Sequence, residues 1–258
     1  MEACLPRIDD AWAWIGGAAT PTDRPVAEWL ALARQEPALR FDRPAVGTVY
    51  GVLLNHVDAL AALGDAAQQP PYKAPPRAPV LYIKPRNTHT AHGAPIVVPA
   101  DVGELEMGAT LGMVIGRTTC RVSEAEALSC VAGYTVCNDV SVPHASYYRP
   151  SMRFKCRDGF LPIGPWIVAA RHAPSPDALR LQVDIDGRTV LQVEAPELVR
   201  SAARLIADVS EFMTLDCGDV LMIGVPAGAP RARAGQRVDI HIDGVGTLSN
   251  PLVAEDAA

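Results

Sequence analysis

The sequence predicts an α+β protein with a mixed, mostly antiparallel β core and a few short helices. Three observations support this fold class. Short apolar runs recur along the chain and are separated by turn residues. Only a few segments carry apolar residues at helical spacing. The 258 residues are enough for one sizeable core, and no internal repeat or low-complexity linker divides the chain after residue 80.

The predicted strands follow one another between turns and do not alternate regularly with long helices. They are residues 46–55, 80–84, 96–98, 110–115, 131–136, 181–185, 189–193, 220–223, 238–242 and 246–252. Asp186-Gly187 lies between two of them and is a strong β-hairpin signal. Residues 68–79 contain five prolines and are predicted to be an extended loop.

Three segments are predicted to be helical. One begins at residues 23–25 and ends at Gln35, with an apolar stripe along one face. Residues 123–126 have the Ser-x-x-Glu form of a capping box, which opens a short helix. Residues 196–213 carry apolar side chains at helical spacing. We expect residues 1–45 to be an N-terminal helical appendage that serves packing or assembly.

Charge and hydropathy exclude several classes of protein. The formal net charge of −6 at pH 7 is opposite to that of a general nucleic-acid binder. All apolar runs are shorter than the roughly 20 residues that span a bilayer, and the first residues do not have the pattern of a secretory signal. The six cysteines include no Cys-x-x-Cys pair. We therefore expect a soluble, cytoplasmic protein with no nucleic-acid or membrane partner.

Residues 131–140 (VAGYTVCNDV) resemble the signature strand of the fumarylacetoacetate hydrolase family, in which such a strand delivers an Asn-Asp pair to the active centre. Four other stretches agree in order and spacing. They are residues 111–116 (LGMVIG), 155–164 (KCRDGFLPIG), 210–218 (SEFMTLDCG) and 224–228 (GVPAG). The resemblance implies that residues 46–258 form a catalytic-type domain with the β-roll or sandwich core of this family.

A narrower resemblance concerns one branch of the family, the bacterial isomerase/decarboxylases of 4-hydroxyphenylacetate (homoprotocatechuate) breakdown. It is carried by the segments PYKAPP, IKPRNT, NDVSVP, YYRP and KCRDGF. These enzymes act on 5-oxopent-3-ene-1,2,5-tricarboxylate and 2-hydroxyhepta-2,4-diene-1,7-dioate and contain two related halves; this chain is similar to the first. The resemblance implies a dicarboxylate or tricarboxylate 2-oxo acid as ligand. It also implies a homo-oligomer or a heteromer with a homologous metal-binding subunit.

The family holds Mg²⁺ or Mn²⁺ between two glutamates of a Glu-x-Glu strand and the aspartate of the Asn-Asp pair, and the ion stabilises an enolate. Asp139 matches that aspartate, but the two glutamate positions hold Gly108 and Thr110. Along an extended strand, Glu106 lies roughly 13 Å from the position of Thr110. Only a bulge or loop would bring Glu106 or Glu104 to the metal position. One carboxylate would hold Mg²⁺ weakly, and we expect little metal in this chain.

Other positions of the family pattern are also changed. Ala59 occupies the position of the general-base histidine, and His56 nearby is an alternative base or a packed histidine. Pro143 replaces an arginine that follows the Asn-Asp pair, and Val225 replaces the threonine of a Gly-Thr-Pro turn. His144 is the nearest imidazole to the Asn-Asp pair and has no assigned role.

Several cationic residues of the family pattern are retained. Lys155 matches the lysine that faces metal and substrate in the family, and Lys84 lies in the KPRN segment. Arg149 and Arg157 can pair with carboxylates bidentately. We expect these four residues to contact substrate, with structural ion pairs or solvated surface positions as the alternative for each.

Three functions stay open from the sequence. The chain is a subunit of the isomerase/decarboxylase with a degenerate metal site, a catalytically silent structural partner of an active homologous subunit, or a stand-alone acylpyruvate-type hydrolase. The hydrolase needs the same metal, so the same replacements count against it.

Overall fold

The computed structural model describes residues 9–16, 18, 20–36, 38–44, 47–144 and 151–255. The strands of the first half are β1 (Ala11–Ile15), β2 (Thr22–Arg24), β3 (Phe41–Asp42), β4 (Val49–Leu53), β5 (Val80–Lys84), β6 (His89–Ala91), β7 (Ile96–Val98), β8 (Leu105–Glu106) and β9 (Ala109–Ile115). Those of the second half are β10 (Val131–Asn138), β11 (Leu161–Ala169), β12 (Arg180–Ile185), β13 (Arg188–Glu194), β14 (Val220–Met222), β15 (Arg231–Ala232), β16 (Arg237–Ile242) and β17 (Gly246–Ala254).

The helices are short and lie around the sheets. The α-helices are α1 (Val26–Gln35), α2 (Val57–Ala61), α3 (Glu124–Ala127), α4 (Met152–Lys155) and α5 (Ala202–Phe212). The 3₁₀ helices are Gly64–Gln68, Arg86–Thr88, Leu128–Cys130 and Pro176–Ala178. Among the described residues, no helix has the length and apolar character needed to cross a bilayer.

The strands form two large sheets and one small pair. The ten-stranded sheet has the order β2-β1-β11-β10-β9-β14-β4-β5, with β3 beside β1 and β6 beside β11. The five-stranded sheet has the order β13-β12-β16-β17-β7, and β15 pairs with β8. Neighbouring strands are antiparallel except β6–β11, β4–β14 and β7–β17. The predicted fold class, α+β with a mixed, mostly antiparallel core, is confirmed.

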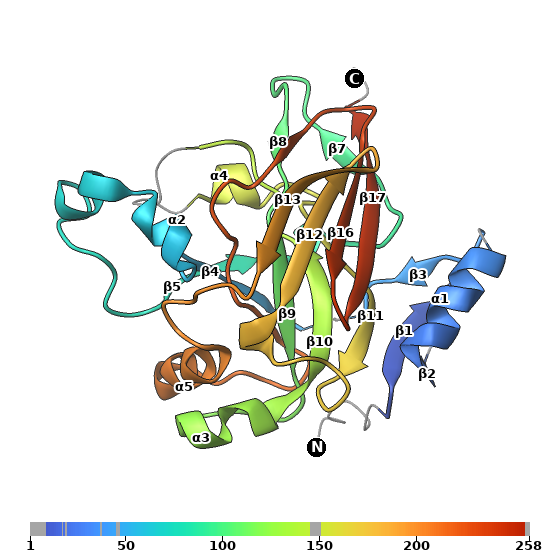
Figure 1. Ribbon diagram of the computed structural model, residues 1–258, viewed down its shortest axis with the longest axis horizontal. Helices are drawn as coiled ribbons and strands as arrows, with labels where there is room; N and C mark the ends of the chain where they lie inside the picture. Colours follow the sequence, from blue (N-terminus) through green and yellow to red (C-terminus); the bar gives the residue numbers. More distant parts are fainter. Residues whose placement is uncertain are drawn as a thin grey trace.

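The two large sheets pack face to face around the main core. Strands β16 and β17 contact β10 of the larger sheet, and Figure 1 shows β12, β13, β16 and β17 in front of β9 and β10. Alternate side chains of β12 and β16 are buried, as expected for strands with one covered face. Strands β9 and β11 are buried along their whole length. The centre of the larger sheet is therefore a rigid support for residues at its strand ends.

The end of β10 is held close to the start of β9. The backbone N–H of Asp139 donates to the carbonyl oxygen of Gly108 (2.8 Å). A Cβ at residue 108 would lie 2.5 Å from the backbone oxygen of Asp139, so the close approach requires glycine there. This contact fixes Asp139 at the edge of the buried sheet.

Strand β11 was not predicted from the sequence, although it has nine buried residues. It contains Pro162 and Pro165, which cannot donate to a β ladder and are usually absent from central strands. The register between β10 and β11 shifts between Tyr134 and Val136, opposite Gly164. The irregular pairing accommodates the prolines.

The N-terminal region contains strands as well as the predicted helix. Helix α1 ends at Gln35, as predicted. Strand β1 pairs with β11 of the larger sheet, and β2 and β3 pair with β1 (Figure 1, blue). The buried Trp29 of α1 donates its indole N–H to the backbone oxygen of Ala11 (2.8 Å). These strands were not predicted from the sequence; the division of the chain at residue 45 stays a prediction.

Helix α5 begins at Ala202, so the predicted start at residue 196 was wrong. The segment before it runs extended because Asn55, at the end of β4, binds it. The Asn55 amide donates to the backbone oxygens of Arg200 (3.1 Å) and Ile223 (2.8 Å), and its Oδ1 accepts from the backbone N–H of Arg200 (3.1 Å). The Ser201 side chain then caps the helix by accepting from the N–H of Arg204.

We expect Asn55→Ala to lower the free energy of unfolding by about 2 kcal/mol or more, because three hydrogen bonds of a buried side chain are lost. Urea denaturation measures this change. Gln69→Ala, at an exposed position, is the control and should change stability by less than about 0.5 kcal/mol. Equal effects of the two substitutions would contradict this role of Asn55.

Candidate functional site

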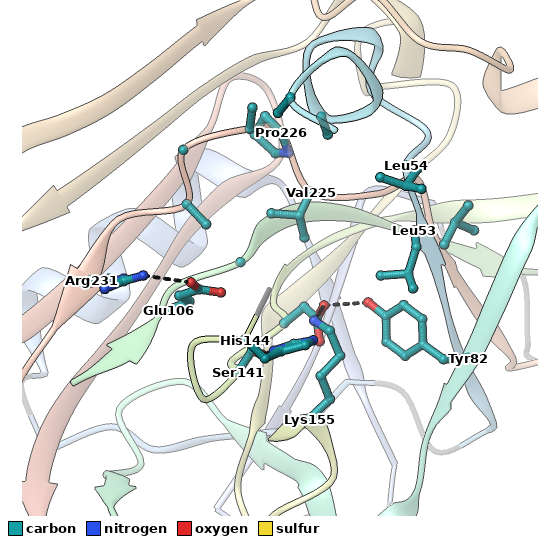
Figure 2. A pocket seen from close by; sticks show the side chains of 18 residues that line it. Leu53, Leu54, Tyr82, Glu106, Ser141, His144, Lys155, Val225, Pro226 and Arg231 are labelled. Carbon is teal, nitrogen blue, oxygen red and sulfur yellow. Dashed lines mark hydrogen bonds and ion pairs between the residues drawn. The ribbon is translucent and has the colours of Figure 1, made fainter. Parts of the chain in front are cut away.

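A cavity of about 300 Å³ lies beside the end of β10 and the start of β9. Its apolar lining comes from Val52, Leu53, Leu54, Ala59, Ala62, Val225, Pro226, Ala227 and Ala229. Its polar lining comes from Tyr82, Glu106, Asp139, Ser141, His144, Lys155 and Arg231. Figure 2 shows Glu106 and Arg231 on one side, Tyr82, Leu53 and Leu54 on the other, and Val225 and Pro226 across from Lys155.

The Asp139 carboxylate is a buried charge at the floor of this cavity. The Lys155 ammonium donates to its Oδ2 (2.6 Å), and the Lys84 Nζ lies 2.9 Å from its Oδ1. The Tyr82 hydroxyl also donates to Oδ2. The side chains of Asp139 and Lys84 have no exposed area. One carboxylate is therefore surrounded by two ammonium groups and a phenol.

Lys84 is held by three oxygen atoms. Besides Asp139 Oδ1, its ammonium donates to the backbone oxygens of Val140 (3.1 Å) and Lys155 (2.6 Å). Burial lowers the pKa of Lys84, and the charge of Asp139 opposes that shift. Because Lys84 is fully buried, bonded to two backbone oxygens and paired with the Asp139 charge, it acts as a structural cation behind the cavity.

The charges around Asp139 keep it ionised. Burial by itself raises the pKa of Asp139, but the charges of Lys155 and Lys84 and the hydrogen bonds from Lys155 and Tyr82 outweigh burial and hold that pKa below its ordinary value. Burial and the charge of Asp139 raise the pKa of Tyr82 well above its ordinary value. At neutral pH the site therefore contains a carboxylate and a neutral phenol.

Tyr82 was not predicted from the sequence as a site residue. It lies on β5 two residues before Lys84, so both side chains project from the same face of the strand. Its ring covers Gly51 of the neighbouring β4, where a Cβ would overlap the ring. In a strand, residues two apart share a face, so the position two residues before Lys84 could have identified Tyr82.

The two positions expected to hold glutamates serve other roles. Gly108 lines the cavity, while Thr110 donates from Oγ1 to the backbone oxygen of Gly224 (2.5 Å) and fixes the turn before Val225. Glu106 also lines the cavity. The sequence had predicted that an extended strand would place it roughly 13 Å from the position of Thr110.

Glu104 and Glu106 belong to an ion-pair cluster with arginines. Glu104 lies 2.9 Å from Arg231 and 3.4 Å from Arg233, and Glu106 lies 3.5 Å from Arg231. The side chains of both glutamates are partly exposed. These carboxylates are therefore balanced by guanidinium groups.

Of the remaining predicted residues, those that the structure describes do not line the cavity. Arg149 lies outside the described residues. Arg157 is not one of the described residues that line the cavity, and it forms a partly exposed ion pair with Asp101 (3.4 Å). His56 is buried at the start of α2 and does not line the described cavity either; burial lowers its pKa.

His144 lines the cavity, although no role was predicted for it. Its Nδ1 lies 2.8 Å from the backbone oxygen of Val142 and 3.3 Å from Ser141 Oγ. Its ring stacks on Phe154. The backbone contact orients this imidazole at the cavity wall.

The donor set around Asp139 does not suit a divalent cation. Mg²⁺ and similar ions need several oxygen ligands, usually with more than one carboxylate. Both oxygens of Asp139 already face ammonium groups, which would repel a second cation. Within the described part of the chain, no three His, Cys, Asp or Glu side chains are grouped so as to hold a metal.

Residues 48–253 match the family described as fumarylacetoacetate (FAA) hydrolase C-terminal, and the chain belongs to this enzyme family. It is similar to the 4-hydroxyphenylacetate degradation bifunctional isomerase/decarboxylase of Salmonella dublin, with 43% identity over 212 residues. That alignment covers 81% of this chain and 48% of the relative. The chain therefore spans about half the length of the bifunctional relatives that it matches.

Solved structures share this fold. The 2-hydroxyhepta-2,4-diene-1,7-dioate isomerase of Mycobacterium marinum has a TM-score of 0.71 and 27% identity, with 96% of this chain and 89% of that chain covered. Maleylpyruvate hydrolase of Sphingobium sp. SYK-6, solved with manganese(II) and pyruvate, has a TM-score of 0.69 and 23% identity, covering 89% and 83%. Proteins with this fold thus include one solved with manganese(II).

We expect Lys84→Met to lower the free energy of unfolding by about 3–5 kcal/mol, because it leaves two carbonyl groups and part of the Asp139 charge unpaired in the interior. Urea denaturation measures the loss. Arg153→Met, which removes an exposed cation from α4, is the matched control and should cost less than about 0.5 kcal/mol.

The double variant Lys84→Met/Asp139→Asn tests whether the ion pair carries this effect. Removal of the second charge should make the combined loss smaller than the sum of the single losses by about 1 kcal/mol or more. Simple additivity would mean that Lys84 acts through packing alone.

Proposed function

We propose that this chain is a subunit of an aromatic-catabolic isomerase/decarboxylase that acts on 5-oxopent-3-ene-1,2,5-tricarboxylate and 2-hydroxyhepta-2,4-diene-1,7-dioate, with a degenerate metal site of its own. The names of the Salmonella and Mycobacterium relatives support the reaction class. Gly108 and Thr110, at the two positions where the family resemblance implies glutamates, support the degenerate site. The proposed location is the cytoplasm.

The residues of the chain suit binding better than the full reaction. An enolate intermediate needs strong positive charge at its oxygen. In this cavity Lys155 is the lining cation nearest the floor, and Asp139 shares its charge. We therefore propose that the isolated chain turns over slowly and that a homologous metal-binding subunit, or a further copy, completes the active assembly.

A second candidate is a catalytically silent structural partner of an active homologous subunit. The observation in its favour is length, because the chain spans about half of each bifunctional relative. The remaining half of such a relative has the size of a second domain of this kind. The two candidates differ in whether the cavity of this chain affects turnover.

Isomerisation of 2-hydroxyhepta-2,4-diene-1,7-dioate, followed by ultraviolet absorbance, tests the proposal. The isolated chain with Mg²⁺ should be roughly 100-fold or more slower than a homologue that has the Glu-x-Glu pair. Mixing the two proteins should give a complex whose rate falls when this chain carries Lys155→Gln. Full magnesium-dependent turnover by the isolated chain would contradict the degenerate site.

An unchanged rate in the complex with Lys155→Gln would instead identify the silent partner. Arg153→Gln, on the same helix but exposed, is the control for a change of net charge.

A further inference from the structure

The floor of the cavity carries one more positive charge than negative charge. Lys84 and Lys155 together face a single carboxylate, Asp139. On the opposite side the ion-pair cluster adds no net charge, since Glu104 and Glu106 balance Arg231 and Arg233. The position where the family resemblance implies a cation is therefore electrostatically suited to an anion.

The two lysines differ in the hydrogen-bonding capacity that they have left. Lys84 is fully buried, donates to two backbone oxygens, lies 2.9 Å from Asp139 Oδ1 and is not among the residues that line the cavity. Lys155 lines the cavity, and within the described residues Asp139 Oδ2 is the one acceptor of its ammonium. Two of its three N–H groups thus stay available to a ligand.

The surroundings of Lys155 fix the position of its ammonium group. Asp139 binds it at 2.6 Å, and the centre of the Tyr82 ring lies 5.1 Å from Nζ. Tyr82 and Lys84 hold the carboxylate in turn. A ligand that meets Lys155 therefore pays little for ordering a flexible side chain.

The rest of the lining determines which anion fits. Leu53, Leu54, Ala59, Val225 and Pro226 form apolar walls around the polar floor. A volume of about 300 Å³ is at the small end of ligand cavities. The combination favours a small carboxylic acid, one carboxylate of which meets the polar floor while a short apolar or unsaturated chain lies against these walls.

We propose that this cavity binds such a carboxylate directly on the Lys155 ammonium, without a divalent ion. The carboxylate accepts from the two available N–H groups, and its chain lies against the apolar walls. The inference deepens the proposed function and rests on it for the class of ligand, a carboxylic acid. It differs in assigning the anion to a lysine of this chain in place of a metal.

Hexanoate is a suitable probe because it has a carboxylate and an apolar chain but does not chelate metal. Titration calorimetry in the presence of EDTA should show saturable binding at one site per chain. Lys155→Gln should weaken binding about tenfold or more, because a charge-assisted hydrogen bond pair is lost. Arg153→Gln, a matched loss of an exposed cation two residues away, should change affinity less than about twofold.

Ala59→Phe gives a second test that leaves every charge in place. It fills part of the cavity and should abolish hexanoate binding even if Lys155→Gln is unstable. The proposal is overturned if hexanoate binds only after Mg²⁺ is added, binds equally to wild type and Lys155→Gln, or does not bind in EDTA. Failure of the turnover assay leaves this binding result intact, so the two proposals fail separately.

Discussion

A buried carboxylate must have counter-charges, and the way in which Asp139 obtains them organises the site. An isolated ionised carboxylate in the interior is strongly destabilising. Here Lys84 comes from β5 and Lys155 from α4, and both reach the Asp139 side chain at the end of β10. The ion pairs thus join three segments that are distant in sequence. The same contacts decide what the cavity is able to bind.

The charge balance also accounts for the residues that replace the expected glutamates. Two more carboxylates beside Asp139 would require a divalent ion, whereas Gly108 and Thr110 add no charge. Gly108 is further constrained because a Cβ there would collide with the backbone oxygen of Asp139. The two lysines and the absence of further carboxylates therefore belong to the same charge balance around Asp139.

The sequence predicted the parts of the fold that depend on local patterns. Short apolar runs between turns identified β12 and β16, the Asp186-Gly187 turn identified the hairpin of β12 with β13, and β5 had its predicted bounds. It missed β11, whose prolines are tolerated through a register shift that no local pattern reveals. It also placed the start of α5 too early, because Asn55, far away in the chain, holds the preceding segment extended.

Family resemblance located the residues of the candidate site better than it located their interactions. It singled out Asp139, Lys84 and Lys155, which the fold brings together. It did not indicate that the lysines would bind the aspartate itself. Lys84 and Asp139 are 55 residues apart (139 minus 84), and residue spacing carries no information on pairs at such a separation. Tyr82 was missed because it reads as an ordinary strand residue until its partner is known.

Titration of the chain with Mn²⁺, followed by electron paramagnetic resonance, tests most directly whether lysines have taken the place of the metal at Asp139. The account predicts no stoichiometric binding at Mn²⁺ concentrations below about 1 mM, because one ion-paired carboxylate is a poor site for a hard cation. Binding of one Mn²⁺ per chain with micromolar affinity, lost in Asp139→Asn, would contradict it.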